Sequence, residues 1–198
     1  MPLSGSTKRN GEGDFAEEYN AQKAQNGFST VGFDDSSWKS ANVIGEYPTG
    51  DYQKVIPELS KPTDYVVHPV EVKKLSDGNT VADFGAVIPV RPQITLKNGV
   101  SGRQLTIQTG YVLNANGTIN SSSAATQSTN MTYKYTQKDG EQTYNTWDHL
   151  GFRYISIPSC DEDFTIETIA AKTLMSMIQF YSAIVIGGRQ FSHLYAHS

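Results

Sequence analysis

Short runs in which apolar and polar residues alternate dominate the middle of this 198-residue chain, most clearly at 68–73, 93–97 and 104–108. Alternation with a period of two, carried by β-branched side chains, predicts strands that bury one face. Between the runs stand turn residues such as Asp77-Gly78 and Asp139-Gly140, which tolerate positive φ angles. Many short strands with frequent turns predict a mostly β protein, an antiparallel, jelly-roll-like β-sandwich.

The pattern changes along the chain and predicts four regions. Residues 1–46 are polar with scattered aromatic positions, and we interpret them as the partial remnant of a preceding β-domain. Residues 47–62 are rich in proline and predict an extended linker. Residues 63–172 contain the alternating runs and predict the sandwich, and 173–198 predict an irregular or helical tail. Helix-favouring residues begin at Ala170.

Composition excludes some classes of function. The formal net charge is −4 with mixed signs, so nothing predicts a nucleic-acid partner or a polybasic membrane surface. The single cysteine, Cys160, cannot form an internal disulfide. The most apolar stretch, 178–186, is too short to cross a membrane. The first ten residues lack the apolar core of a secretory signal, so we expect a cytoplasmic location, or a secreted one if the true N-terminus is missing.

Several landmarks occur in a fixed order between residues 83 and 157. They are Asp83-Phe84-Gly85, the stretch 109–118, and Gly151-Phe152-Arg153-Tyr154-Ile155, with 32–38 upstream. The series resembles the non-catalytic, concanavalin-like β-sandwich region that precedes the helical catalytic barrel in bacterial and fungal α-L-rhamnosidases of glycoside hydrolase family 78. The resemblance implies an accessory portion of an enzyme that hydrolyses terminal α-L-rhamnose. A stand-alone carbohydrate-binding module and a vestigial structural fragment are the alternatives.

The resemblance also implies candidate sugar-binding residues. The stretch 16–22 looks like the family's Gly-Glu-x-Tyr-Asp-Ala-Arg motif, with Asn and Gln in place of its Asp and Arg. It indicates Glu17, Tyr19 and Asn20 as polar and aromatic contacts to carbohydrate. Because sugar rings have an apolar face, Trp38 and Trp147 are candidate platforms, or else anchors in the core or at its rim.

Calcium is the one cofactor that the resemblance suggests, since some domains that precede the sandwich bind rhamnose through calcium. Asp14, Glu17 and Asn20 are the candidate oxygen ligands. The alternative is that these are ordinary solvated polar residues. The expected partners are rhamnosides and the helical catalytic barrel of the full-length enzyme.

Other motifs favour structural interpretations. Asp83-Phe84-Gly85 lacks the accompanying motifs of a protein kinase, so Phe84 is expected to anchor the core and Gly85 to permit a bend. We expect Arg153 to pair with an acidic neighbour or to cap backbone carbonyls, in preference to a contact with substrate. Inverting glycosidases need two carboxylic groups about 6.5 to 9.5 Å apart. No pair in this chain matches the acidic motif of the family's barrel, so no catalytic residue is assigned and enzymatic activity of this chain alone stays uncertain.

Overall fold

A computed structural model of the protein describes residues 3–4, 7–11, 13–48, 54, 63–161 and 163–172. The described residues of 1–25 and 64–170 form one compact unit, and those of 26–63 belong to another. The elements are β1 Leu3–Ser4, β2 Glu18–Asn20, the 3-10 helix η1 Ala21–Lys23, β3 Thr63–Val67, β4 Glu71–Lys74, β5 Thr80–Gly99, β6 Gln104–Gly110, α1 Ser123–Thr126, β7 Thr132–Thr136, β8 Gly140–Asn145, β9 Leu150–Ile157 and β10 Phe164–Lys172.

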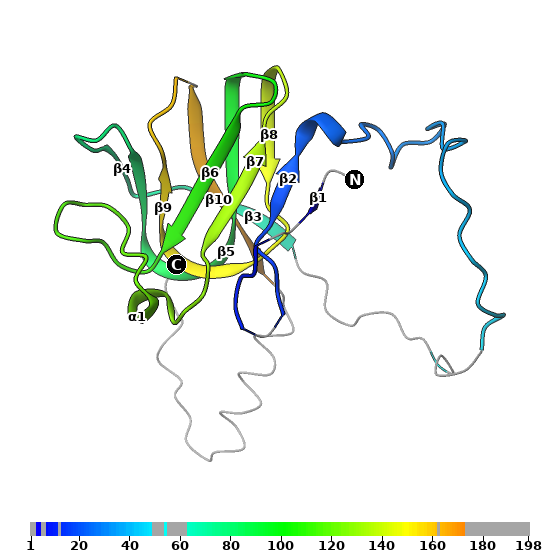
Figure 1. The fold of residues 1–198 in the computed structure, drawn as a ribbon, viewed down its shortest axis with the longest axis horizontal. Helices are drawn as coiled ribbons and strands as arrows, with labels where there is room; N and C mark the ends of the chain where they lie inside the picture. The colour runs from blue at the N-terminus through cyan, green and yellow to red at the C-terminus, as the bar shows by residue number, and fades with distance from the viewer. Residues whose placement is uncertain are drawn as a thin grey trace, which may run out of the picture. The chain divides into compact units, whose positions relative to one another are not determined.

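Strand β5 is 20 residues long and belongs to both layers of the β-sandwich (Figure 1). Its first part, 80–83, pairs antiparallel with β4 on one side and β9 on the other. Its last part, 93–96, pairs antiparallel with β8 and β10. The ten described strands form one continuous sheet in the order β1-β2-β7-β6-β9-β5-β10-β3, with β4 and β8 also paired to β5. We call β1, β2, β7, β6, β9 and β4 with the first part of β5 the first layer, and β8, β10 and β3 with the last part of β5 the second layer. The predicted mostly β, antiparallel sandwich is confirmed.

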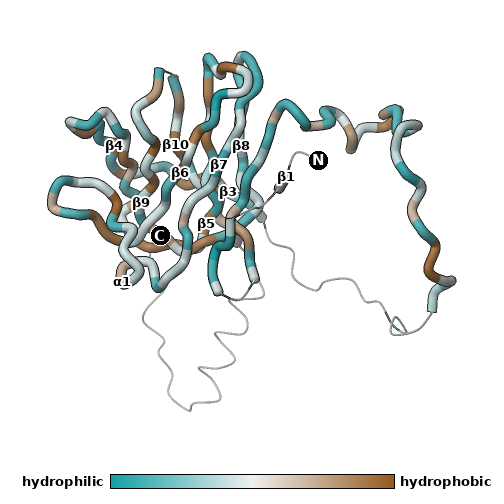
Figure 2. The backbone as a smooth tube through the Cα atoms, in the orientation of Figure 1, coloured by the Kyte–Doolittle hydropathy of each residue, from teal (hydrophilic) through white to brown (hydrophobic). Residues whose placement is uncertain are grey.

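Alternating side chains from both layers fill the core. Along β6, β7 and β8, buried residues alternate with exposed or half-buried ones, and Figure 2 shows the hydrophobic stretches as short and interrupted. The largest fully buried apolar side chains are Tyr133, Phe152, Ile94, Leu96, Ile107, Ile155 and Ile157. Burial of this kind stabilises a sandwich by roughly 1.5–3 kcal/mol for each large side chain. The tyrosines of β7 contribute to packing, as their alternate positions indicate.

A bulge in β5 occurs at Asp83-Phe84-Gly85, where the register against β9 shifts between residues 83 and 88. Gly85 has a φ of +81°, which an L side chain adopts only at a cost. Phe84 is buried in the core. The Asp83 carboxylate accepts a hydrogen bond from the Gly85 amide at 2.7 Å and two from the Arg153 guanidinium at 2.8 Å. The expected core anchor, bend and acidic partner of Arg153 are all confirmed.

The N-terminal segment adds a strand to the first layer. Strand β2 lies parallel to β7, with Tyr19 opposite Tyr135, although more than 100 positions separate them in the chain. Helix η1 follows directly, and the Asn20 side chain caps it by accepting a hydrogen bond from the Gln22 amide. The segment is therefore part of the same compact unit as the sandwich.

The helix-favouring interpretation is wrong for residues 170–172, because β10 continues as a strand to Lys172. Ala170 is buried and lies opposite Val90 of β5, and this pairing outweighs intrinsic helix propensity. The predicted tail at 173–198 and most of the predicted linker at 47–62 lie outside the described residues. The division of the chain at 46, 62 and 172 stays a prediction.

We expect Gly85→Ala to lower the free energy of unfolding by about 1–2 kcal/mol, because it forces an L side chain into the left-handed region. Space is not the problem, since the nearest side-chain atoms to an added Cβ are those of Val70 at 3.6 Å. Urea denaturation followed by circular dichroism measures the loss. Gly11→Ala is the control, because it has open space and no positive φ. Equal losses in both variants would contradict the strain argument.

The Asp83–Arg153 pair makes stability depend on pH. Hydrogen bonding from the Arg153 guanidinium lowers the pKa of Asp83 from its ordinary value of 3.8. Because the folded pKa lies below the unfolded one, the pair's contribution is complete above about pH 4 and is lost as the pH falls through the folded pKa. Melting temperatures of the wild type and Asp83→Asn should therefore differ most at pH 6–7 and converge in acid. A difference that stays constant down to pH 2.5 would refute this.

Candidate functional site

The loop between β8 and β9, residues 146–149, is fastened by a buried carboxylate from the N-terminal segment. Glu17 is only 5% exposed. One of its oxygens accepts a hydrogen bond from the Tyr144 hydroxyl at 2.7 Å. The other accepts from the backbone amides of Trp147 at 2.7 Å and Asp148 at 3.0 Å. A buried charge needs such partners, because its transfer from water is otherwise costly. Glu17 therefore ties the loop to the N-terminal segment.

Arg9 fastens the same loop a second time. Its guanidinium donates to the Asp148 carboxylate at 2.9 Å and to the Asn130 carbonyl at 2.7 Å. The guanidinium carbon lies 4.9 Å from the centre of the Tyr133 ring, a cation–π distance. The Nε atom of Arg9 is buried without a hydrogen-bond partner. Arg9 and Glu17, two buried charged residues of the N-terminal segment, thus both bind the 146–149 loop.

Three tyrosines pack beside this network. The rings of Tyr135 and Tyr144 are stacked with centroids 4.4 Å apart, and Tyr19 lies 6.0 Å from the first and 5.6 Å from the second. Burial raises the pKa of Tyr135 to about 12. Burial, reinforced by the adjacent Glu17 charge, also raises the pKa of Tyr144. The hydroxyls of Tyr135 and Tyr144 therefore stay protonated at neutral pH, so these two groups are hydrogen-bond donors.

Trp147 stands out because its surroundings are ordered and its side chain is not covered. Its backbone amide donates to Glu17 and the preceding residue, Thr146, is 1% exposed, yet Trp147 as a whole residue is 65% exposed. An exposed aromatic ring on a loop that is already held in place loses little conformational freedom on binding a partner. The arrangement suits recognition of a flat apolar surface, such as one face of a sugar ring.

The structure brings together some of the predicted binding residues. Glu17 contacts the Trp147 amide directly, and Tyr19 packs on the tyrosine that donates to Glu17. Asn20 is used as the cap of η1. Trp38 belongs to the other unit, where its ring lies 5.6 Å from that of Phe33 and it is 46% exposed. Neither tryptophan is a core anchor.

The predicted calcium ligands each make separate local contacts. Glu17 uses both oxygens for the hydrogen bonds described above, Asn20 caps η1, and the Asp14 carboxylate accepts from Asn10 at 3.0 Å. Within the described part of the chain, no group of three or more His, Cys, Asp or Glu side chains is placed to hold a metal ion. Calcium binding stays a prediction.

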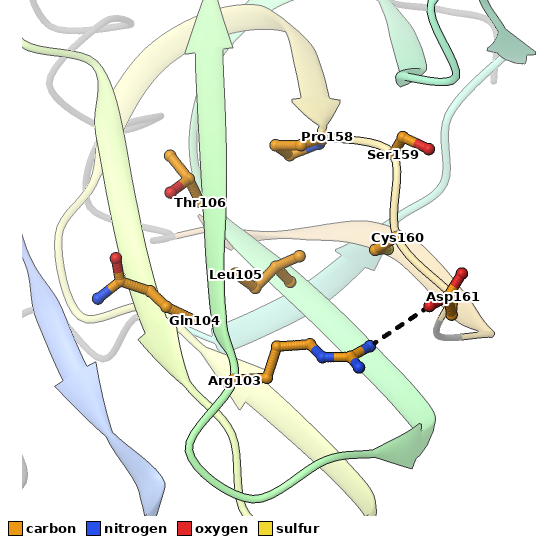
Figure 3. A pocket seen from close by; sticks show the side chains of 8 residues that line it. All are labelled: Arg103, Gln104, Leu105, Thr106, Pro158, Ser159, Cys160 and Asp161. Carbon is orange, nitrogen blue, oxygen red and sulfur yellow. Dashed lines mark ion pairs between the residues drawn. The ribbon is translucent and has the colours of Figure 1, made fainter.

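A shallow pocket of about 340 Å³ lies elsewhere, between β6 and the β9–β10 connection (Figure 3). Arg103 and Asp161 face each other across it at 3.9 Å, so their charges largely offset one another. Cys160, Leu105 and Pro158 supply apolar surface. None of the predicted site residues lines this pocket. Within the described residues, no helix has the length and apolar character needed to cross a membrane.

Sequence reasoning missed three parts of the network: Arg9, Asp148 and the Tyr144 hydroxyl. Arg9 lies among polar residues that carry no strand pattern, and its partners are more than 120 positions away. Asp148 follows Trp147 in a loop, where an acidic residue predicts a solvated turn. Only the motif at 16–22 carried a signal, because it singled out Glu17.

We expect Glu17→Gln to lower the free energy of unfolding by about 1–3 kcal/mol, because the amide can accept from the two backbone N–H groups with its oxygen but loses the charge that strengthens these bonds, and its nitrogen can no longer accept from the Tyr144 hydroxyl. Urea denaturation measures the effect. Glu18→Gln is the matched control, because Glu18 is the neighbouring residue and makes a half-buried ion pair with Lys134 at 3.0 Å. That pair is worth about 0–1 kcal/mol. Equal losses in the two variants would contradict the anchoring role of Glu17.

Comparison with known proteins shows which proteins share this fold. The chain matches an α-L-rhamnosidase from Dictyoglumus thermophilum with a TM-score of 0.66 and 25% identity, over 87% of this chain and 19% of that one. It also matches the α-L-rhamnosidase of Aspergillus terreus, with a TM-score of 0.62 and 22% identity over 86% of this chain and 19% of that one. The enzyme of Streptomyces avermitilis, complexed with L-rhamnose, gives 0.63 and 23% over 87% and 16%.

The chain therefore spans less than a fifth of the length of these enzymes. No curated protein matches the chain significantly. A family model described as the bacterial alpha-L-rhamnosidase concanavalin-like domain matches residues 73–176, which is more than half of the chain. The protein belongs to the family of concanavalin-like domains of bacterial α-L-rhamnosidases.

Proposed function

We propose that this chain is the non-catalytic accessory sandwich of an α-L-rhamnosidase whose catalytic part is a helical barrel. The main support for the proposal is the contrast between how much of this chain is matched and how little of the matching enzyme this chain covers. The family model and the Dictyoglumus enzyme match most of this chain, whereas the chain accounts for 19% of that enzyme. In the whole protein the sandwich would support the barrel, and the whole protein would hydrolyse terminal α-L-rhamnose from glycosides or polysaccharides.

The use of acidic residues in the sandwich supports an accessory role. Glycoside hydrolysis by inversion needs two carboxylic groups on either side of the scissile bond. Glu17 is the one acidic residue among the buried ones in the described residues, and its oxygens are occupied by the 146–149 loop. Asp83 is occupied by Arg153 and Gly85. These carboxylates hold the fold together, so catalysis is expected from another part of the enzyme.

A stand-alone carbohydrate-binding module is the second candidate, and the exposed Trp147 favours it. A module of this kind binds sugar through an uncovered aromatic ring without any catalytic partner. The two candidates differ in one respect: the accessory role requires a catalytic region in the same protein.

The proposal predicts what the native gene encodes. We expect its transcript to continue in frame into a helical barrel with paired acidic residues. The product of that reading frame should hydrolyse 4-nitrophenyl α-L-rhamnoside, and the purified 198-residue chain should not. Release of nitrophenolate measures both. A transcript without a barrel would overturn the accessory role and leave the stand-alone module. Hydrolysis by the chain alone would place catalysis within it and overturn both.

A further inference from the structure

We propose that the outer face of the second layer, together with Trp147, is a binding surface for a neutral glycan. Six side chains from three neighbouring strands form this polar face: Thr143 and Asn145 of β8, Gln93 and Thr95 of β5, and Thr165 and Glu167 of β10. The proposal deepens the accessory role and rests on it for the kind of glycan, one that contains rhamnose.

The strand register places the six side chains in two rows. Thr165 lies opposite Thr95, and Thr95 lies opposite Thr143. In the next row, Glu167 lies opposite Gln93, and Gln93 opposite Asn145. All six are exposed or half-buried, whereas the intervening residues, such as Ile94 and Tyr144, are buried in the core. Neighbouring strands are about 4.8 Å apart, so the rows form a regular grid of polar groups.

Hydrogen bonds within the rows orient these side chains but leave some of their donors and acceptors unused. The Gln93 amide nitrogen donates to the Asn145 amide oxygen at 2.7 Å, and the hydroxyls of Thr95 and Thr143 share one hydrogen bond at 3.0 Å. An amide offers two donors and a carbonyl oxygen, and a hydroxyl offers one donor and two lone pairs. Each row therefore keeps donors and acceptors for a ligand that presents many hydroxyls.

The few charged side chains on and beside the polar face favour an uncharged ligand. Five of the six side chains are neutral, and the sixth, Glu167, lies 3.1 Å from the His68 ring nitrogen. The cationic side chains nearest in sequence are paired with carboxylates: Arg91 with Asp64 at 2.6 Å, and Lys97 with Asp163 at 3.3 Å. Among the described residues, Arg91 and Lys97 next to this face are already paired and so favour a phosphate or sulfate little, whereas a polyhydroxylated sugar would find matching hydrogen-bond partners.

Trp147 supplies the apolar component that a row of hydroxyls and amides lacks. The alternation along β8 continues beyond its last residue, because Thr146 is buried and still donates its amide to Pro92 of β5, and Trp147 is exposed. The Glu17 carboxylate holds the Trp147 backbone. Aromatic stacking on a sugar ring and hydrogen bonds along the polar face are together the usual requirements of glycan recognition.

The test uses the full 198-residue chain with Trp38→Phe, which leaves Trp147 as the only tryptophan because the sequence contains two. The probe is a neutral oligosaccharide of α-L-rhamnose, with dextran oligosaccharides of equal length for comparison. We expect the rhamnose probe to shift the emission of Trp147 to shorter wavelength in a saturable manner, because the sugar displaces water from the indole. Isothermal titration calorimetry gives the affinity independently of fluorescence.

Two sets of variants test the surface. Trp147→Ala should weaken binding in calorimetry about tenfold, and Thr95→Val with Thr143→Val should weaken it roughly five- to tenfold through the loss of two hydroxyls. Valine keeps the shape of threonine and suits a strand, so the fold is retained. Thr106→Val on β6 of the first layer is the matched control and should bind as the parent does.

Each outcome decides the proposal. An unchanged affinity in the double threonine variant would overturn the polar face and leave an isolated tryptophan. No binding of either probe at millimolar concentration would overturn the glycan surface and favour the catalytic domain as the occupant of this face. These results are independent of the gene's downstream sequence. A chain that binds sugar but has no barrel would refute the accessory role alone, and a barrel with a non-binding sandwich would refute this inference alone.

Discussion

The buried carboxylate of Glu17 is the interaction on which the position of the 146–149 loop depends. It joins the N-terminal segment to strand β8 and to the loop that follows β8 and carries Trp147, although the partners lie 127 to 131 positions away in the sequence. A carboxylate removed from water is stable only when hydrogen bonds replace its hydration, and here three donors do so. The same requirement that makes Glu17 costly to bury therefore makes the loop well ordered.

The region matched by the family model is not the same as the compact unit seen in the structure. The matched region begins at residue 73, so it omits Arg9, Glu17 and strand β2. The structure places these residues in the same compact unit as the sandwich. Strand β2 pairs with β7, and Arg9 and Glu17 form hydrogen bonds with the 146–149 loop. A sandwich without the N-terminal segment would expose the edge of β7 and would leave the Tyr144 hydroxyl and two loop amides without their acceptor.

The long strand β5 connects the two layers, which differ in what they present to the rest of the protein. Its bulge at Asp83-Phe84-Gly85 changes the register, and the ion pair with Arg153 holds the bend. Beyond the bend, the same strand contributes Gln93 and Thr95 to the second layer, where they face solvent with neighbours from β8 and β10. The first layer therefore receives the N-terminal segment, and the second presents a polar face with an exposed tryptophan.

Much of the fold was predictable from local sequence, and most of the site was not. Period-two alternation predicted the strands because a half-buried strand must place apolar residues on one side only, and Asp83-Phe84-Gly85 predicted a core anchor and a bend. The motif at 16–22 drew attention to Glu17, though not to its burial. The network of Arg9, Asp148 and Tyr144, and the rows of the polar face, depend on which strands become neighbours and in which register. The sequence by itself determined where strands and turns form, because those depend on neighbouring residues. Tertiary structure alone decided which distant polar groups meet, because hydrogen bonds between them form only after the layers pack.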